Sequence, residues 1–239
     1  MYQSTRIRVA AGEPSKVRLE EASRAVLLVV GFALLTALGA QVRIPIQPVP
    51  ITLQTFFVLL GGLMLGPNLG ALAQVLYVSL GAAGAPVFAG EGVGRAYLLG
   101  PTGGYLLGFA ASAWLVGQLI RVLDVRPGLS LDLARRVNLW RGSILRDGRQ
   151  PFDAAQAGAH EVGATVERQA NWASVPRPWR LLGVLAAGIV AVYVPGVIWL
   201  ALVTGMGLGK AVVAGALPFV PGDVLKALLA ASIWMRLPR

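Results

Sequence analysis

No charged side chain occurs between residues 44 and 90, a stretch in which most residues are apolar. The hydrocarbon core of a bilayer takes about 20 apolar residues in helical form, so one helix cannot account for this stretch. Residues 25–42, 100–120 and 181–209 form further charge-free segments. The chain is 56% hydrophobic and 13% charged, with a mean hydropathy of +0.67. This composition indicates a membrane protein, although the length alone would suit one or two soluble domains.

Prolines and glycines divide the apolar segments into helices. Residues 66–68, with the sequence Gly-Pro-Asn, interrupt the longest one and predict an antiparallel hairpin of helices over residues 52–65 and 69–81. The other predicted helices cover residues 25–42, 100–120, 181–209 with a kink at Pro195 and Gly196, and 221–237. We therefore predict an all-α polytopic protein with six transmembrane helices in one membrane domain over residues 25–233.

Positive charge is concentrated at particular ends of the apolar segments. Of the 21 basic residues, 17 lie in the N-terminal tail of residues 1–24, in the arginine-rich loop of residues 121–180, or in the C-terminal tail of residues 234–239. By the positive-inside rule, both termini and this loop are cytoplasmic, which implies the cytoplasmic membrane. A nucleic-acid-binding protein would instead spread its positive charge over one folded surface. We expect contact with the lipid bilayer and none with nucleic acid.

The arginine-rich loop holds ten arginines, six acids and the single histidine of the chain. Its residues 129–145 have helix-like apolar spacing and predict an amphipathic helix on the membrane surface, whereas residues 151–177 are expected to be flexible. His160 stands beside Glu161 but has no second histidine, so we interpret it as a solvated side chain. Since the chain also has no cysteine, the sequence predicts no metal site and no cofactor.

Three irregular segments fall on the side of the membrane opposite the arginine-rich loop. Residues 45–50 hold three prolines, which favour an extended connector that lies as an apolar cap over the protein. The other two segments are residues 84–94 and residues 210–222. Most polar residues at membrane level lie near these segments, which is typical of a site that captures a solute from outside. A proton pump or an ion channel would carry acids through the membrane depth instead.

Asp223 and Lys226 are the only ionisable residues between residues 211 and 235. A charge inside a membrane segment costs on the order of 3 kcal/mol, so it tends to persist where it faces the protein interior or has a function. The two residues are three apart and share one face of a helix. Two interpretations remain open: a pair that contacts a ligand, and a self-contained salt bridge that locks the last helix.

Small residues occur in two groups, the glycines of residues 100–106 and the pair Ala33 and Ala37, and each group can be interpreted in two ways. The glycines of residues 100–106 can cradle an anion at a helix start, or they can permit close helix packing; a phosphate-binding P-loop is not indicated, because its lysine and preceding strand are missing. Ala33 and Ala37 form a small-xxx-small pair, which lets another helix approach. Packing within the chain is the favoured interpretation of this pair.

Four motifs occur in order along the chain: Val-Pro-Ile-Thr-Leu-Gln-Thr at residues 49–55, Gly81 with Ala-Pro-Val-Phe-Ala-Gly at residues 85–90, Gly-Pro-Thr-Gly-Gly-Tyr-Leu at residues 100–106, and Leu-Pro-Phe-Val-Pro-Gly-Asp-Val-Leu-Lys-Ala at residues 217–227. Together they resemble the BioY family, the biotin-binding S components of energy-coupling factor (ECF) transporters.

The resemblance implies a membrane protein that binds biotin at its outer face and releases it inward. Such a protein works with a transmembrane coupling protein and two ATPase subunits, which some members do without. Small residues of the first helix contact the coupling protein in the family, and Ala33 and Ala37 match them. The chain has no Walker motif, so the resemblance implies a transporter subunit and not an enzyme.

Family members use the aspartate and lysine of the last motif in ligand binding, which transfers to Asp223 and Lys226. Biotin has a ureido group with two N–H donors and one carbonyl, an apolar ring and chain, and a carboxylate. Asp223 can accept both N–H donors, and Lys226 can meet the carbonyl or a carboxylate. Tyr105 or Trp199 is expected to cover the apolar body.

Arg43 or Arg95 is expected to help bind the far anionic end of biotin, and which end of biotin points inward stays open. An asparagine that some relatives place in the third loop is missing from residues 89–92 of this chain. Glu91 or Arg95 is the candidate to replace it, although these two residues can also pair with each other.

Other functions remain as hypotheses. The first is an S component or a solitary transporter for a different small vitamin-like solute, because ligand-contacting loops can change on a conserved scaffold. Another is a membrane scaffold that acts through the arginine-rich loop. An intramembrane enzyme has the least support, since no second acid, serine–lysine pair or histidine pair lies at membrane level.

Overall fold

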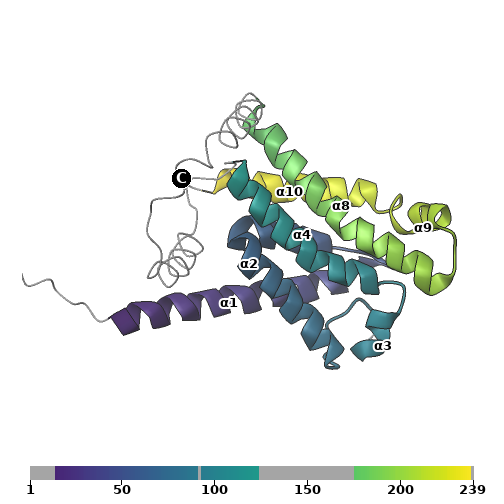
Figure 1. Cartoon of the computed structure of the whole chain (residues 1–239), viewed down its shortest axis with the longest axis horizontal. Helices are drawn as coiled ribbons and strands as arrows, with labels where there is room; N and C mark the ends of the chain where they lie inside the picture. Colours follow the sequence, from purple (N-terminus) through teal and green to yellow (C-terminus); the bar gives the residue numbers. More distant parts are fainter. Residues whose placement is uncertain (1–13, 91–92, 124–174, 238–239) are drawn as a thin grey trace, which may run out of the picture.

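Seven helices and a short two-stranded ladder make up the part of the chain that this computed structural model describes, residues 14–90, 93–123 and 175–237. In chain order they are α1 (Pro14–Gln41), β1 (Arg43–Ile44), β2 (Ile51–Thr52), α2 (Gln54–Ala82), α3 (Gly94–Leu99), α4 (Gly103–Val122), α8 (Arg177–Thr204), α9 (Leu208–Gly215) and α10 (Val220–Arg236). Figure 1 shows the long helices packed as a bundle, with the short helices α3 and α9 at the same end.

The helices have the length and composition of membrane spans. Within the described residues, four helices are long and apolar enough to cross a membrane: α1 from Glu20 onward, α2, α4 and α8. A fifth candidate combines α9 with α10, which meet at an angle of 52°. Large apolar side chains remain exposed on these helices, such as Leu27 at 72% and Leu202 at 73%, as expected for surfaces that face lipid. The predicted helical membrane protein is confirmed.

α2 consists of two antiparallel halves. Gly66 has non-helical dihedral angles, φ 76° and ψ −175°, and Pro67 follows it. Gln54 donates a hydrogen bond to the Tyr77 hydroxyl at 2.6 Å, although the two residues are 23 positions apart. A straight helix would separate them by about 35 Å at ~1.5 Å per residue. The chain therefore reverses at Gly66, and the hairpin predicted from residues 66–68 is confirmed.

Several helix ends differ from the prediction. α1 starts at Pro14, so one helix holds both the end of the N-terminal tail and the predicted span over residues 25–42. α8 ends at Thr204, where Gly205 adopts a left-handed φ of +68°, and does not continue to residue 209. α9 lies mostly in a segment predicted to be a loop, and α3 fills the gap before the predicted start of the fourth helix. Helices this short have too few apolar positions to show a period in the sequence.

Glycines bring α4 and α8 into close contact. A Cβ atom at Gly104 would meet Trp199 and the Pro195 carbonyl, and one at Gly108 would meet the backbone of Val192, all within 3.0 Å. Backbones this close are typical of membrane helix pairs with small residues at their interface. The packing interpretation of the glycines in residues 100–106 is thus the one the structure supports.

The two ends of the arginine-rich loop are held together. Arg180, in the first turns of α8, donates from Nη1 to the Leu123 carbonyl at the end of α4, at 2.9 Å. The turn of α2 lies at this same end, because a Cβ at Gly66 would be 2.8 Å from Nη2 of Arg121. Some predictions for the loop lie outside the described residues: the amphipathic helix at residues 129–145, residues 151–174 of the segment expected to be flexible, and the solvated His160.

This contact predicts that much of the loop can be removed. Deleting residues 129–174 is expected to change the thermal unfolding midpoint by less than about 2 °C, because seven remaining residues at up to ~3.3 Å each easily join two helix ends already in contact. The measurement is thermal unfolding of the purified protein in detergent. As a control in the full chain, Arg180→Ala should lower the midpoint, since the Leu123 carbonyl loses its donor. Aggregation of the deletion variant would contradict the prediction.

Candidate functional site

Two adjoining cavities lie at the end of the bundle that carries α3 and α9. The inner cavity has a volume of about 50 Å³ and is lined from α4, α8, α10 and the start of α2. The outer cavity has a volume of about 460 Å³ and is lined from the β1–β2 connection, α3 and the residues that follow α3. Pro50, Ala89, Tyr97 and Thr102 line both cavities, so the inner cavity lies directly behind the outer one.

The connection between β1 and β2 covers these cavities. The two strands pair antiparallel, with Arg43 opposite Thr52 and Ile44 opposite Ile51. The enclosed prolines keep the connection extended, and Val49 is buried at 6% exposure. Val49 and Pro50 line the inner cavity. The apolar cap predicted for residues 45–50 is therefore present.

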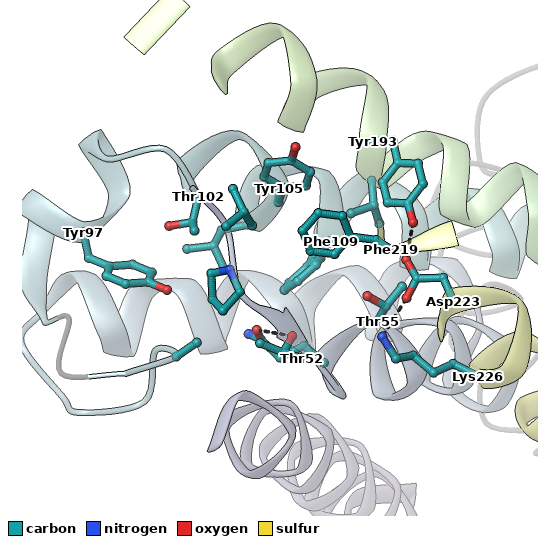
Figure 2. Close-up of a pocket in the computed structure, with 16 residues that line it drawn as sticks. Thr52, Thr55, Tyr97, Thr102, Tyr105, Phe109, Tyr193, Phe219, Asp223 and Lys226 are labelled. Carbon is teal, nitrogen blue, oxygen red and sulfur yellow. Dashed lines mark hydrogen bonds and ion pairs between the residues drawn. The ribbon is translucent and has the colours of Figure 1, made fainter. Parts of the chain in front are cut away.

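Asp223 and Lys226 lie on the wall of the inner cavity. α10 starts at Val220 with Pro221 in its first turn, which places Asp223 in that turn as well. Lys226 donates from Nζ to Oδ1 of Asp223 at 2.7 Å, and the two residues are 8% and 2% exposed. Tyr193 of α8 donates to the other carboxylate oxygen, Oδ2, at 2.5 Å. Figure 2 shows both interactions beside the cavity.

A chain of hydrogen bonds fixes Gln54 on the same wall. The Thr52 hydroxyl donates to Oε1 of Gln54 at 2.9 Å, and Nε2 of Gln54 donates to the Tyr77 hydroxyl. Tyr77 in turn donates to the Val87 carbonyl at 3.3 Å. These bonds connect the cap, both halves of α2 and the segment that leads to α3, so the polar edge of the cavity has a defined orientation.

Tyr105 and Trp199 have different positions relative to the inner cavity. Tyr105 lines it, and its hydroxyl donates to the Gly215 carbonyl of α9 at 2.8 Å. Trp199 lines neither of the two cavities; its Nε1 donates to the Gly100 carbonyl at 2.9 Å, and its side chain packs against Gly104. Tyr105 is thus available to contact a ligand, whereas Trp199 supports the start of α4 from behind.

The charged loop residues that were predicted to contact the ligand also differ in their position relative to the cavities. Arg43 lines the outer cavity beside Tyr97, whereas Arg95 is exposed on α3 and lines neither of the two cavities. Glu91 lies outside the described residues. Burial raises the pKa of the Tyr97 phenol above its usual value, and Thr102 and the charge of Arg43 lower it by less. The Tyr97 hydroxyl therefore stays protonated at neutral pH and can donate a hydrogen bond.

Ala33 and Ala37 face the interior of the chain. Ala33 is 2% exposed and belongs to a buried cluster with Tyr77 and Phe88, and Ala37 packs against this cluster. Ala33 therefore has almost no exposed surface, whereas Ala37 is half-buried. The packing interpretation of their spacing agrees with this arrangement.

Several polar residues of the site were not singled out from the sequence. They are Thr52, Gln54, Thr55, Thr102, Tyr97 and Tyr193. The threonines and Gln54 lie inside the motifs at residues 49–55 and 100–106. A polar side chain among apolar ones in a membrane protein could have identified them as residues of the site. Tyr193 is the only tyrosine of α8, a helix whose other spanning residues are mostly aliphatic. Its hydroxyl needs a partner at membrane depth, which was a second signal.

Comparisons with known proteins agree in sequence and in fold. The chain matches the model of the BioY family over residues 11–143 and 156–239. It is 35% identical over 215 residues to a probable biotin transporter BioY of Pyrococcus horikoshii, and this alignment covers 90% of this chain and 96% of that protein. It is 31% identical over 210 residues to the biotin transporter BioY of Rhizobium etli, and this alignment covers 87% of this chain and 89% of that protein.

A solved structure supports the same fold. The crystal structure of the S-component for biotin from an ECF-type ABC transporter aligns with a TM-score of 0.62 and 23% identity, over 91% of this chain and 92% of that chain. The family model covers both sides of the arginine-rich loop, as the four motifs do. By sequence and by fold, the chain belongs to the BioY family.

Proposed function

We propose that this protein binds biotin and takes it up across the cytoplasmic membrane as the S component of an ECF transporter. The main support is a buried, ion-paired Asp223 and Lys226 on the wall of a cavity that opens under a loop cap. Relatives that align over most of the chain are named as biotin transporters. A second candidate function is transport of a different small vitamin-like solute, and a ligand-competition experiment distinguishes the two functions.

The proposed topology has six crossings with both termini in the cytoplasm. The two halves of α2 supply two crossings, and α9 with α10 supplies the sixth after α1, α4 and α8. Arg121, Arg180 and Arg236 lie at the ends of α4, α8 and α10 that adjoin the arginine-rich loop or the C-terminal tail. The positive-inside rule assigns that end to the cytoplasm, so the cavities open to the outside.

The cavity matches the chemistry of biotin. Each oxygen of Asp223 accepts one hydrogen bond in the structure and keeps a lone pair for a ureido N–H. Lys226 keeps N–H donors for the ureido carbonyl. Leu106, Phe109 and Phe219 line the inner cavity together with Tyr105 and offer an apolar surface to the ring.

Coupling to ATP hydrolysis is proposed to come from partners, a transmembrane coupling protein and two ATPase subunits, because the chain has no Walker motif. In this proposal α1 contacts the coupling protein. Ala33 reaches such a partner only if α1 moves, since it is buried in the cluster with Tyr77 and Phe88, whereas Ala37 is half-buried beside this cluster.

The test is binding of radiolabelled biotin to the purified full chain in detergent. We expect saturable binding that unlabelled biotin displaces and that riboflavin and thiamin do not displace. Displacement by another vitamin, with biotin inactive, would favour the second candidate. Absence of binding for all three ligands in a protein that unfolds cooperatively would refute both candidates.

A further inference from the structure

We propose that Tyr77 is a positioning residue for ligand binding, because its hydroxyl decides which way the amide of Gln54 faces at the inner cavity. Tyr77 itself lines neither of the two cavities, so it acts through Gln54 and not by contact with the ligand. This inference rests on the proposed function and goes beyond it, since it gives a role in binding to a side chain outside the site.

The amide of Gln54 is a polar group on the cavity wall that can only rotate. Gln54 is 4% exposed and lines the inner cavity. Its backbone is held, because the preceding N–H of Leu53 donates to two carbonyls in and just after the last turn of α1, at 3.0 and 3.1 Å. Among the described residues, one amide N–H is used by Tyr77 and one lone pair of the amide oxygen by Thr52. One donor and one acceptor therefore remain for a ligand.

Thr52 does not determine the direction of this amide. A threonine hydroxyl can donate or accept, so it bonds equally well to an oxygen or to an NH2 group in the same place. Half a turn of the amide would keep a bond to Thr52 but would exchange the positions of the remaining donor and acceptor. Figure 2 shows Thr52 and its hydrogen bond on this wall. The direction of the amide must therefore come from its other partner, Tyr77.

The hydroxyl of Tyr77 has its single proton committed to a backbone carbonyl. It donates to the Val87 carbonyl at 3.3 Å, and a carbonyl can only accept. The Tyr77 oxygen is left to accept, so the part of Gln54 that lies 2.6 Å away has to be the NH2 group. With the amide reversed, Tyr77 would have to donate to Gln54 instead, and the Val87 carbonyl would lose this donor. The Val87 carbonyl thus sets the direction of the amide through one tyrosine hydroxyl.

The ring of Tyr77 is held in place by its packing. Tyr77 is fully buried and meets Phe88 edge-to-face, with 5.7 Å between the ring centroids. Phe88 is also fully buried, and a Cβ atom at Gly81 would come within 3.0 Å of its ring. Tyr97 stacks on Phe88 with 4.7 Å between the centroids. Since close-packed aromatic rings leave little room to shift, the hydroxyl keeps a fixed position.

The main test is Tyr77→Phe, which removes the hydroxyl and keeps the ring. The amide of Gln54 can then take either direction, and only one of them suits the ligand. Biotin is therefore expected to bind about three- to tenfold more weakly. Dissociation constants for biotin and thermal unfolding midpoints are measured on the same purified full-length samples.

Thr36→Val is the matched control, because it removes a buried hydroxyl from a similar pair. The Thr36 hydroxyl accepts from Nε2 of Gln74 at 3.2 Å, and both residues are fully buried. Neither of them lines the two cavities. This variant should lower the unfolding midpoint, as Tyr77→Phe does, and leave the affinity for biotin unchanged.

A double variant shows whether Tyr77 acts through Gln54. Gln54→Met removes the amide and is expected to weaken biotin binding by about tenfold to hundredfold, the range for loss of a single hydrogen-bonding group. Adding Tyr77→Phe to Gln54→Met should cause no further loss of affinity, because no amide remains to be directed. The unfolding midpoint should still fall, since the Val87 carbonyl loses its donor.

Four results would overturn the inference. They are unchanged biotin affinity in Tyr77→Phe, an equal loss of affinity in Thr36→Val, the same fold loss from Tyr77→Phe with and without the Gln54 amide, and a loss far beyond hundredfold in Gln54→Met. The third would mean that the hydroxyl acts through the segment at Val87, and the fourth is too large for a single amide. Failure of the proposed function is seen separately, as an absence of biotin binding by the unsubstituted protein.

Discussion

Replacing Lys226 by methionine is expected to abolish measurable biotin binding and to lower the free energy of unfolding by about 3–5 kcal/mol. Methionine keeps much of the length of lysine but leaves Asp223 as a charge at 2% exposure, with Tyr193 as the one remaining side-chain donor among the residues that the structure describes. A buried charge that loses its ion pair is among the most destabilising changes known for single substitutions. Binding is lost as well, since Lys226 lines the inner cavity.

A double variant separates the ligand-binding interpretation from the salt-bridge interpretation. Asp223→Asn together with Lys226→Met removes both charges and keeps an acceptor for the Tyr193 hydroxyl. We expect the double variant to recover most of the stability that Lys226→Met loses, because no unpaired charge remains. Biotin binding should stay absent, since the ureido group then lacks both the carboxylate and the ammonium.

The measurements are thermal unfolding and labelled-biotin titration of the same purified samples. Lys210→Met is the matched control, because Lys210 is exposed on α9 and lines neither of the two cavities. It should leave both quantities unchanged. Recovery of both stability and biotin binding in the double variant would instead show that the pair only locks α10.

The sequence predicts the parts of this site that depend on local chemistry. Gly66 and Pro67 break the longest apolar segment, so the hairpin of α2 follows directly. Asp223 and Lys226 are charges in an apolar segment, so their position inside the protein follows from the cost of exposing them to lipid. The four motifs then identify the family, and the family supplies a ligand hypothesis for the pair.

The parts that the sequence does not predict depend on how each helix is rotated. α1 is apolar on the side that faces lipid and on the side that faces the protein, so no hydrophobic period shows which way Ala33 points. The same argument applies to Trp199, which packs behind α4, and to Tyr193, which meets Asp223 from another helix. A contact between two helices is a property of their packing and not of either sequence segment.

Adding one methyl group at Gly104 is expected to destabilise the protein by about 2 kcal/mol or more and to weaken biotin binding. The Cβ of Gly104→Ala would meet the Pro195 carbonyl and the Trp199 Cβ well under 3.0 Å; the first is a backbone atom of α8 and the second is attached directly to its backbone. Neither atom can move aside as the tip of a flexible side chain can, so α4 and α8 must separate. Tyr105, the next residue, lines the inner cavity and would move with α4.

Gly183→Ala makes the identical chemical change at a place with space for it. Gly183 lies on α8, it is exposed, and a Cβ there would meet no atom within 4 Å. Alanine is the better helix former by about 1 kcal/mol, so this variant should keep or slightly raise the thermal unfolding midpoint and bind biotin normally. Thermal unfolding and biotin titration of the two variants side by side give the comparison. Equal midpoints for Gly104→Ala and Gly183→Ala would mean that close contact between α4 and α8 does not hold the bundle together.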